Sequence, residues 1–121
     1  MIYCDYRSYV RMGGLMTEEQ YQIWGSRATR KIDQLTMGRA QAHRLYLAAE
    51  LADACGQMAD AMQRQAAART SSASGLLAGA STDGYSERYS AGNSRAAERE
   101  LYRLLADALG NDPYGLLYAG V

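Results

Sequence analysis

The sequence contains no phenylalanine, and it has only one proline, one histidine, one tryptophan and two cysteines. The single histidine, His43, has no His, Cys or carboxylate at metal-ligand spacing beside it, so the sequence predicts no metal centre. Cys4 and Cys55 share no motif spacing that would activate a thiol. We expect two buried or incidental reduced thiols, and a single disulfide between them is the alternative.

The sequence also lacks the motifs of common catalytic and cofactor sites. None of its glycines is followed by the Gly-Lys-Ser/Thr of a P-loop. Asp53 and Asp60 lie two helical turns apart, and a solvated helix face explains such a pair better than acid–base catalysis. We therefore expect the chain not to be an enzyme and to use no cofactor.

Charge and hydropathy set further bounds. The 13 basic and 13 acidic residues cancel, whereas a free-standing nucleic-acid binder usually carries a basic excess. No stretch approaches the ~20 apolar residues of a membrane span, and the N-terminal residues lack the apolar core of a signal peptide. We expect one small domain over residues 1–121, soluble and made in the cytosol.

Tyrosine is the dominant aromatic residue, with ten copies. Its hydroxyl requires water or a partner, so tyrosine is enriched where one side of the ring is apolar and the other is wet. We therefore expect most of the aromatic rings to lie near a surface or an interface.

Hydrophobic periodicity predicts three helices, at about 18–35, 38–69 and 94–109. Thr17 and Gln20 form a capping box at the start of the first. The expected core residues are Tyr21, Trp24, Ala28, Ile32, Leu35, Leu47, Leu51, Ala54, Cys55, Met58, Met62, Leu101, Leu104, Leu105 and Ala108. Alanines on several faces of the second helix indicate that it packs on two sides.

Residues 70–93 are rich in serine and glycine and interrupt the helical pattern. Asp83 and Gly84 are a typical two-residue hairpin turn, followed by Tyr85 and Tyr89. We expect a β-hairpin at about 76–90, and a flexible loop is the alternative. The predicted fold is mainly α: a small three-helix bundle with this hairpin between its second and third helices and an extended C-terminal tail.

The predicted tail, residues 111–121, ends in six apolar residues, 116–121, which follow a helix end at Gly110 and a proline, Pro113. Chain termini are normally polar and frayed unless something holds them in place. The tail is therefore either a docking segment for a partner or a strand folded back on its own domain. Its candidate docking residues are Leu116, Leu117, Tyr118, Gly120 and Val121.

Four segments together resemble the small head–tail connector (adaptor) proteins of long-tailed phages and their prophages. The first is the tyrosine-rich lead-in at 6–9 with the glycine pair at 13–14, and the second is Ala28 with residues 32–39. The third is the Asp-Gly-Tyr segment at 81–86, and the fourth is the closing Leu-Leu-Tyr-Ala-Gly-Val at 116–121.

The resemblance implies a helical subunit that assembles into a homo-oligomeric ring, a dodecamer in the virion, below the portal protein. Such a ring occupies the neck of the virion, extends the channel for passing double-stranded DNA without sequence-specific contacts, and presents a surface to a stopper or tail-completion protein. It would be made in the cytoplasm of a bacterial host. The tail would reach the portal or an adjacent subunit, and the hairpin would contact a neighbouring ring or subunit.

The junction between the first two predicted helices carries part of this resemblance. Asp33 could pair with Arg39 across the turn and fix the angle between the helices, while Thr36 could cap the second helix. We therefore expect Asp33, Thr36 and Arg39 to set the geometry of the bundle.

A second class of function is a small helical packaging or regulatory protein that binds nucleic acid. Arg27, Arg30 and Lys31 on the first predicted helix would then face the phosphates, and binding would weaken steeply with salt. The zero net charge argues against this alternative.

Overall fold

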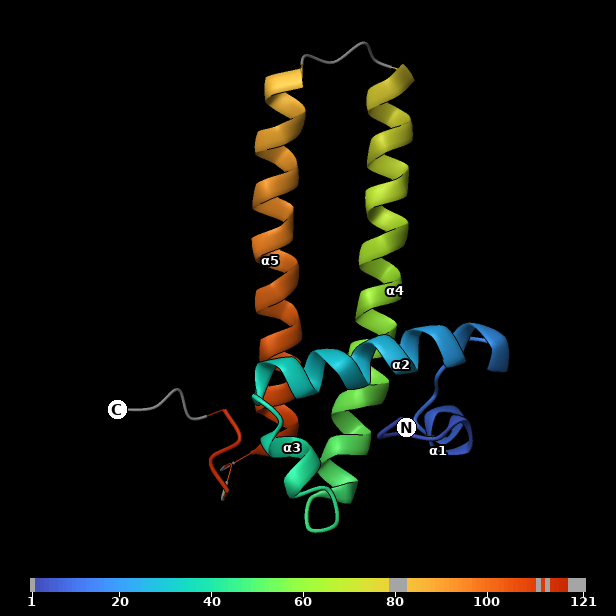
Figure 1. Cartoon of the computed structure of the whole chain (residues 1–121). Helices are drawn as coiled ribbons and strands as arrows, with labels where there is room; N and C mark the ends of the chain where they lie inside the picture. The colour runs from blue at the N-terminus through green and yellow to red at the C-terminus, as the bar shows by residue number, and fades with distance from the viewer. Residues whose placement is uncertain (1, 79–82, 111, 113, 118–121) are drawn as a thin grey trace.

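The computed structural model describes residues 2–78, 83–110, 112 and 114–117, with side chains described up to residue 68 and again from residue 95. The helices are α1 (Tyr6–Arg11), α2 (Glu18–Leu35), α3 (Arg39–Ala42), α4 (Ala48–Ala78) and α5 (Asp83–Leu109). Two long helices, α4 and α5, lie side by side and extend beyond α2, which crosses them, while α1 and α3 lie at the lower end (Figure 1). The mainly helical fold is confirmed.

The bounds of α2 follow from local signals, and the predicted range 18–35 is confirmed. The Gln20 backbone N–H donates to the Thr17 hydroxyl at 3.3 Å, and the Thr17 N–H donates to the Gln20 side-chain oxygen at 3.1 Å. Two orphan donors of the first turn are thus satisfied. Met16 and Tyr21 are both buried at this end of the helix, at the positions of a hydrophobic staple.

The predicted second helix, 38–69, is wrong at both ends, since α4 begins at Ala48 and ends at Ala78. The chain instead forms the short α3, then turns through residues 43–47 before α4 begins at Ala48. The His43 carbonyl accepts hydrogen bonds from the N–H groups of Tyr46 and Leu47 at 3.0 and 3.1 Å, which closes this turn. The turn redirects the chain so that Leu47 and Leu51 enter the core.

The predicted β-hairpin at 76–90 is not supported. Residues 76–78 complete α4 and residues 83–90 begin α5, while 79–82 lie outside the described residues. An acidic residue such as Asp83 suits the first turn of a helix as well as it suits a tight turn. Residues 83 and 84 therefore belong to the start of a long helix that pairs with α4.

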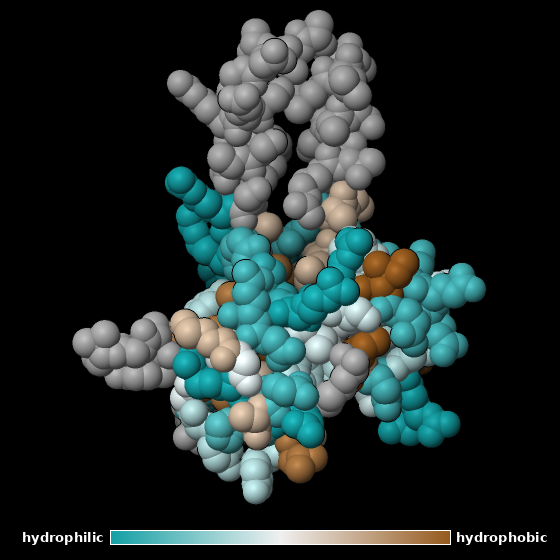
Figure 2. Space-filling model, in the orientation of Figure 1, coloured by the Kyte–Doolittle hydropathy of each residue, from teal (hydrophilic) through white to brown (hydrophobic). Residues whose placement is uncertain are grey.

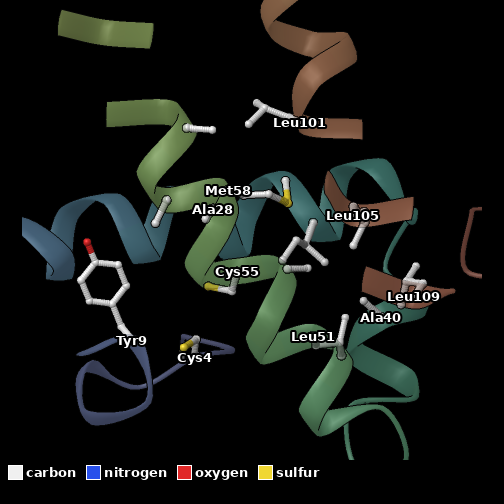
Figure 3. Close-up of a cluster of buried hydrophobic side chains, with 14 of the residues drawn as sticks. Cys4, Tyr9, Ala28, Ala40, Leu51, Cys55, Met58, Leu101, Leu105 and Leu109 are labelled. Atoms are coloured by element: carbon white, nitrogen blue, oxygen red, sulfur yellow. The ribbon is translucent and has the colours of Figure 1, made fainter. Parts of the chain in front are cut away.

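The hydrophobic core surrounds α4, which packs against both α2 and α5, as the alanines on its several faces predicted. Ala54, Ala59 and Ala61 are fully buried and let the neighbouring backbones approach closely. Met58 of α4 and Leu105 of α5 lie in the centre of this cluster (Figure 3). Of the predicted core, the side chains of Trp24, Leu35, Met62, Leu104 and Ala108 lie at its edge and are partly buried.

Within the described part of the chain, no helix is both long and apolar enough to cross a membrane.

Candidate functional site

Arg39 joins two segments that lie far apart in the sequence. Its Nε and Nη2 atoms donate to the Leu116 carbonyl oxygen at 3.0 and 2.8 Å. The Leu116 side chain is fully buried in the core. A planar guanidinium that donates two N–H groups to one carbonyl oxygen fixes both the distance to that oxygen and the direction of approach. The junction of α2 and α3 is thereby tied to the C-terminal segment.

Asp112 holds the same C-terminal segment from the other side. Its two carboxylate oxygens accept from the backbone N–H groups of Leu116 and Leu117, at 2.7 and 2.9 Å. The chain reaches this position through left-handed residues at Gly110 (φ 63°) and Asp112 (φ 49°). The tail could be a docking segment or a segment folded back on its own domain. At Leu116 the chain folds back on its own domain.

The other predicted tail residues divide into two groups. Leu117 is half-buried against the core. Tyr118, Gly120 and Val121 lie outside the described residues. The predicted hairpin residues Asp83, Gly84, Tyr85 and Tyr89 fall in the first turns of α5, where side chains are not described.

Thr36 is buried and links α2 to α3. Its hydroxyl donates to the Ile32 carbonyl at 2.8 Å and accepts from the Ala40 N–H at 3.2 Å. It thus serves the first turn of α3, as a capping threonine would, although Gly38 (φ 80°) occupies the N-cap position.

The predicted pair between Asp33 and Arg39 does not form, and each of these residues contacts a different partner. The Asp33 carboxylate accepts a short hydrogen bond from the Tyr3 hydroxyl, whereas Arg39 holds Leu116. The Tyr3 N–H donates to the Thr29 hydroxyl at 3.1 Å. Asp33 therefore anchors the N-terminal segment to α2. Burial, and next the bond to Asp33, raise the pKa of Tyr3 above its ordinary value.

Three tyrosines stack at the contact between α1 and α2, and two of them are fully buried. The other described tyrosine side chains are partly buried or exposed, which agrees with the expectation that most aromatic rings lie near a surface. Tyr9 and Tyr21 are fully buried with ring centroids 4.3 Å apart, and Tyr6 packs beside them. The Tyr9 hydroxyl donates to Asp60 at 2.6 Å and accepts from the N–H groups of Leu15 and Met16 at 3.1 Å. Asp60 is therefore a structural partner, which corrects its interpretation as part of a solvated helix face.

Alkaline pH is expected to unfold the protein through these tyrosines. Burial raises the pKa of Tyr9 and of Tyr21 in the folded state, and unfolded tyrosine titrates near pH ~10. The neutral hydroxyls therefore stabilise the fold fully below that pH, and their contribution is lost as the pH rises above it. A titration followed by phenolate absorbance and circular dichroism should show ionisation coinciding with loss of helix. Ionisation of all tyrosines near pH ~10 with the helix signal intact would contradict this expectation.

Cys4 and Cys55 are free and buried, as expected for reduced thiols. Burial raises the pKa of the Cys4 thiol. Cys55 Sγ lies 3.5 Å from the Thr29 hydroxyl and 3.8 Å from the Tyr21 hydroxyl. A buried thiol with a raised pKa has little thiolate, so the environment of Cys4 favours neither reactivity nor metal binding. Among the described residues, no group of three or more His, Cys, Asp or Glu side chains could hold a metal ion.

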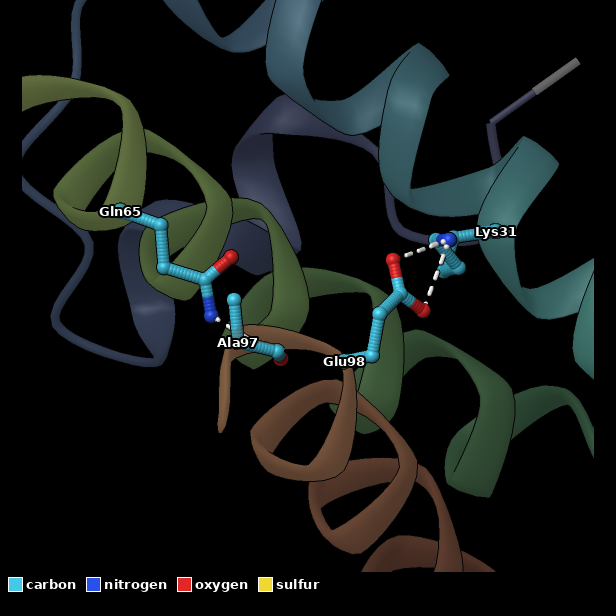
Figure 4. A network of polar contacts seen from close by, with 4 residues as sticks. All are labelled: Lys31, Gln65, Ala97 and Glu98. Carbon is cyan, nitrogen blue, oxygen red and sulfur yellow. Dashed lines mark hydrogen bonds and ion pairs between the residues drawn. The ribbon is translucent and has the colours of Figure 1, made fainter. Parts of the chain in front are cut away.

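The three cations of the nucleic-acid alternative do not form one free basic face. Lys31 Nζ pairs with both carboxylate oxygens of Glu98 on α5, at 2.8 and 3.0 Å (Figure 4). The Arg27 guanidinium lies 4.8 Å above the Trp24 ring, and Arg30 is exposed. Lys31 thus joins α2 to α5, and the geometry does not favour phosphate binding by this face.

Close to the Lys31–Glu98 pair, polar contacts of Gln65 join the two long helices, α4 and α5. Gln65 on α4 donates from Nε2 to the Ala97 carbonyl at 3.2 Å, which Figure 4 shows, and to Glu100 Oε1 at 3.1 Å. Such partly exposed contacts each contribute about 1 kcal/mol or less to stability. These contacts fix the register of α4 against α5, and most of the stabilising free energy of the helix pair comes from other interactions.

Sequence reasoning missed a set of exposed apolar residues at the turn between α3 and α4. Leu45 and Tyr46 are 82% and 73% exposed. Tyr114 stacks on His43 with ring centroids 4.6 Å apart and lies 6.0 Å from the Tyr46 ring. The misplaced helix at 38–69 concealed this turn, because Leu45 and Tyr46 there looked like ordinary helical positions.

The fold and these contacts define a mainly helical domain in which two long helices extend from a base formed by α1, α2, α3 and the C-terminal segment (Figure 1). Comparison with protein-family models, with curated proteins and with solved structures finds no match.

Proposed function

We propose that the chain is a structural virion protein of the head–tail connector type. Copies of it form a ring between the portal and the tail or stopper, and the ring extends the DNA channel when the head is completed and joined to the tail. The protein acts by ordered docking and not by catalysis. Its place of action is then the neck of the virion.

The observation that carries this proposal is the contact between Arg39 and Leu116. The two residues belong to separate segments, 32–39 and 116–121, on which the resemblance to connector proteins rests. They are 77 positions apart, and two hydrogen bonds join them. The contact supports the proposal because it places two of the four resembling segments against each other in the fold.

The experiment is a mass measurement in solution of the full chain alone and mixed with the portal protein of the same genome. A co-migrating complex supports the proposal, and its absence at micromolar concentrations of both proteins overturns it. A mobility-shift assay with double-stranded DNA at low salt tests the nucleic-acid alternative, which predicts a shift that weakens steeply as salt rises.

A truncated variant locates the docking segment. It ends at Leu117, so that it keeps the buried Leu116 and its bonds to Arg39 and Asp112. Loss of the portal complex in this variant, with helix content unchanged, assigns docking to the last four residues. A complex that survives the truncation assigns docking to another surface of the domain.

A further inference from the structure

Met12 ends α1, and its side chain belongs both to the surface and to a contact with α4. It is the C-cap residue of α1 and is 42% exposed. Figure 2 shows apolar residues exposed among hydrophilic ones beside the N-terminal part of α2. A single exposed apolar residue needs no explanation. Met12 differs from the others in the contact that the end of its side chain makes.

The end of the Met12 side chain lies directly on the backbone of α4 at the buried Gly56. A Cβ atom at position 56 would lie 2.7 Å from Met12 Cε and 2.8 Å from Met12 Sδ. Contacts this short do not occur between real atoms, so any larger residue would displace the thioether. Glycine weakens a helix relative to alanine, and at this position it leaves the space that Met12 occupies.

Tyr9 and Met12 both contact α4, and the two contacts are about one helical turn apart. The Tyr9 hydroxyl donates to Asp60 at 2.6 Å, and Met12 lies on Gly56, four residues earlier in α4. Tyr9 is fully buried, whereas Met12 is partly exposed. Met12 is therefore the more accessible of two contacts that hold α1 on α4.

The Met12 thioether also covers a buried thiol. Cys4 is 1% exposed, and its Sγ donates a weak hydrogen bond to Met12 Sδ at 4.0 Å. A Cβ atom at position 56 would lie 3.7 Å from the same Sγ, so Cys4, Met12 and Gly56 meet at one point. Cys55 faces α2 instead, where its Sγ lies 3.5 Å from the Thr29 hydroxyl.

We propose that Met12 is an oxidation site, at which a peroxide converts the thioether to a sulfoxide and so releases α1 from α4. The sulfur attacks one peroxide oxygen, and the S–O bond forms as the O–O bond breaks. With hydrogen peroxide the leaving hydroxide takes the remaining proton and departs as water. The sulfur loses two electrons and the peroxide gains them. Met16 and Met58, at 4% and 0% exposure, are shielded from this reaction.

The sulfoxide does not suit the place that the thioether occupies. Oxidation turns an apolar side chain into a polar and chiral one, and it adds an oxygen to a sulfur that lies between α4 and Cys4. The backbone at Gly56 leaves no space for a further atom. We therefore expect the Met12 side chain to leave α4 and Cys4 to lose its cover. The Tyr9–Asp60 bond remains, so the change is local, and methionine sulfoxide reductases would reverse it.

This inference goes beyond the proposed function and does not depend on it, so its test uses the full chain alone. The chain is treated with hydrogen peroxide, the excess is removed, and dithiothreitol restores any oxidised thiol while leaving sulfoxides in place. Peptide mass mapping should show one added oxygen at Met12 and at Met37, which is 71% exposed, before any at Met16 or Met58.

Alkylation of the two cysteines by iodoacetamide then measures the release of α1. Oxidation of Met12 should make alkylation of Cys4 at least about fivefold faster, because a local opening no longer has to break the Met12 contact. Cys55 serves as the internal control, since it faces α2 and should change much less. A general loss of stability would accelerate both cysteines equally.

Three variants separate Met12 from the other methionines. Met12→Leu keeps the apolar volume and removes the sulfur, so peroxide should leave its Cys4 rate unchanged. Met37→Leu is the matched control and should respond to peroxide as wild type does. Gly56→Ala places a methyl group where the end of Met12 lies, so Met12 should move outward and oxidise faster relative to Met37. Circular dichroism should show the same helix content in all three.

Four results would overturn the proposal. The first is a Met12 that oxidises as slowly as Met58, and the second is an unchanged Cys4 rate when Met12 is fully oxidised. The third is an equal acceleration of Cys4 and Cys55, which would mean general unfolding. The fourth is a response to peroxide that persists in Met12→Leu.

Discussion

Gly14→Ala is expected to destabilise the protein by about 3 kcal/mol or more, at the upper end of the range for overpacked cores. A Cβ atom at position 14 would lie 2.2–2.4 Å from three atoms of the Tyr9 ring. The ring cannot move aside, because it stacks on Tyr21 and its hydroxyl holds Asp60. A loss of this size is a large part of the ~5–15 kcal/mol that stabilises a typical domain.

Urea unfolding of Gly14→Ala measures this loss, and a double-mutant cycle with Tyr9→Ala tests its cause. Tyr9→Ala removes the ring and is itself destabilising, but it leaves space for the new methyl group. Adding Gly14→Ala to that background should then cost much less than it does in wild type. Equal costs in the two backgrounds would show that the clash with Tyr9 is not the reason.

Leu116→Ala is expected to cost about 2–5 kcal/mol, the usual range for a fully buried leucine. The Leu116 side chain has no exposed surface, and its backbone is held by Arg39 and by Asp112. The surroundings therefore have little freedom to collapse into the cavity. The change should also loosen the C-terminal segment, which limited proteolysis would detect as earlier cleavage after residue 110.

Leu117→Ala is the matched control for this substitution. The neighbouring leucine has the same chemistry and is only partly buried, so its truncation should cost clearly less in urea unfolding. If the two alanine variants have the same free energy of unfolding, the C-terminal segment does not pack as described, and an open docking tail becomes the better interpretation.

The predicted fold was accurate where local chemistry decides the outcome. The capping box of Thr17 and Gln20 marks the start of α2, and the glycine at position 110 marks the end of α5, because both depend on hydrogen bonds and dihedral angles within a few residues. The 3.6-residue period likewise identified Tyr21, Ile32, Leu51 and Leu105 as buried.

The β-hairpin prediction is not supported, and the physical reason is that propensity is a weak guide where tertiary packing intervenes. An Asp-Gly pair favours a tight turn, yet Asp83 lies in the first turn of α5. Two helices packed against each other can carry serine and glycine that would weaken an isolated helix. The places of the two predicted strands are taken by the end of α4 and the start of α5.

The sequence indicated which residues matter at the candidate site, but it did not indicate which residues they contact. The resemblance to connector proteins indicated Asp33, Thr36 and Arg39 as a group at the junction of two helices, and Thr36 does join α2 to α3. Their main partners, Tyr3 for Asp33 and Leu116 for Arg39, lie 30 and 77 positions away. No local pattern encodes such pairs, since they depend on how the helices pack.

The sequence by itself thus determined a helical chain, the start of α2, the end of α5 and most of the core, because these depend on neighbouring residues and on the period of apolar side chains. Only the tertiary structure decided that Tyr9 is buried, that Leu116 belongs to the core and that Leu45 and Tyr46 are exposed. Burial at these positions depends on which distant segments cover each side chain, and that is a property of the packed molecule.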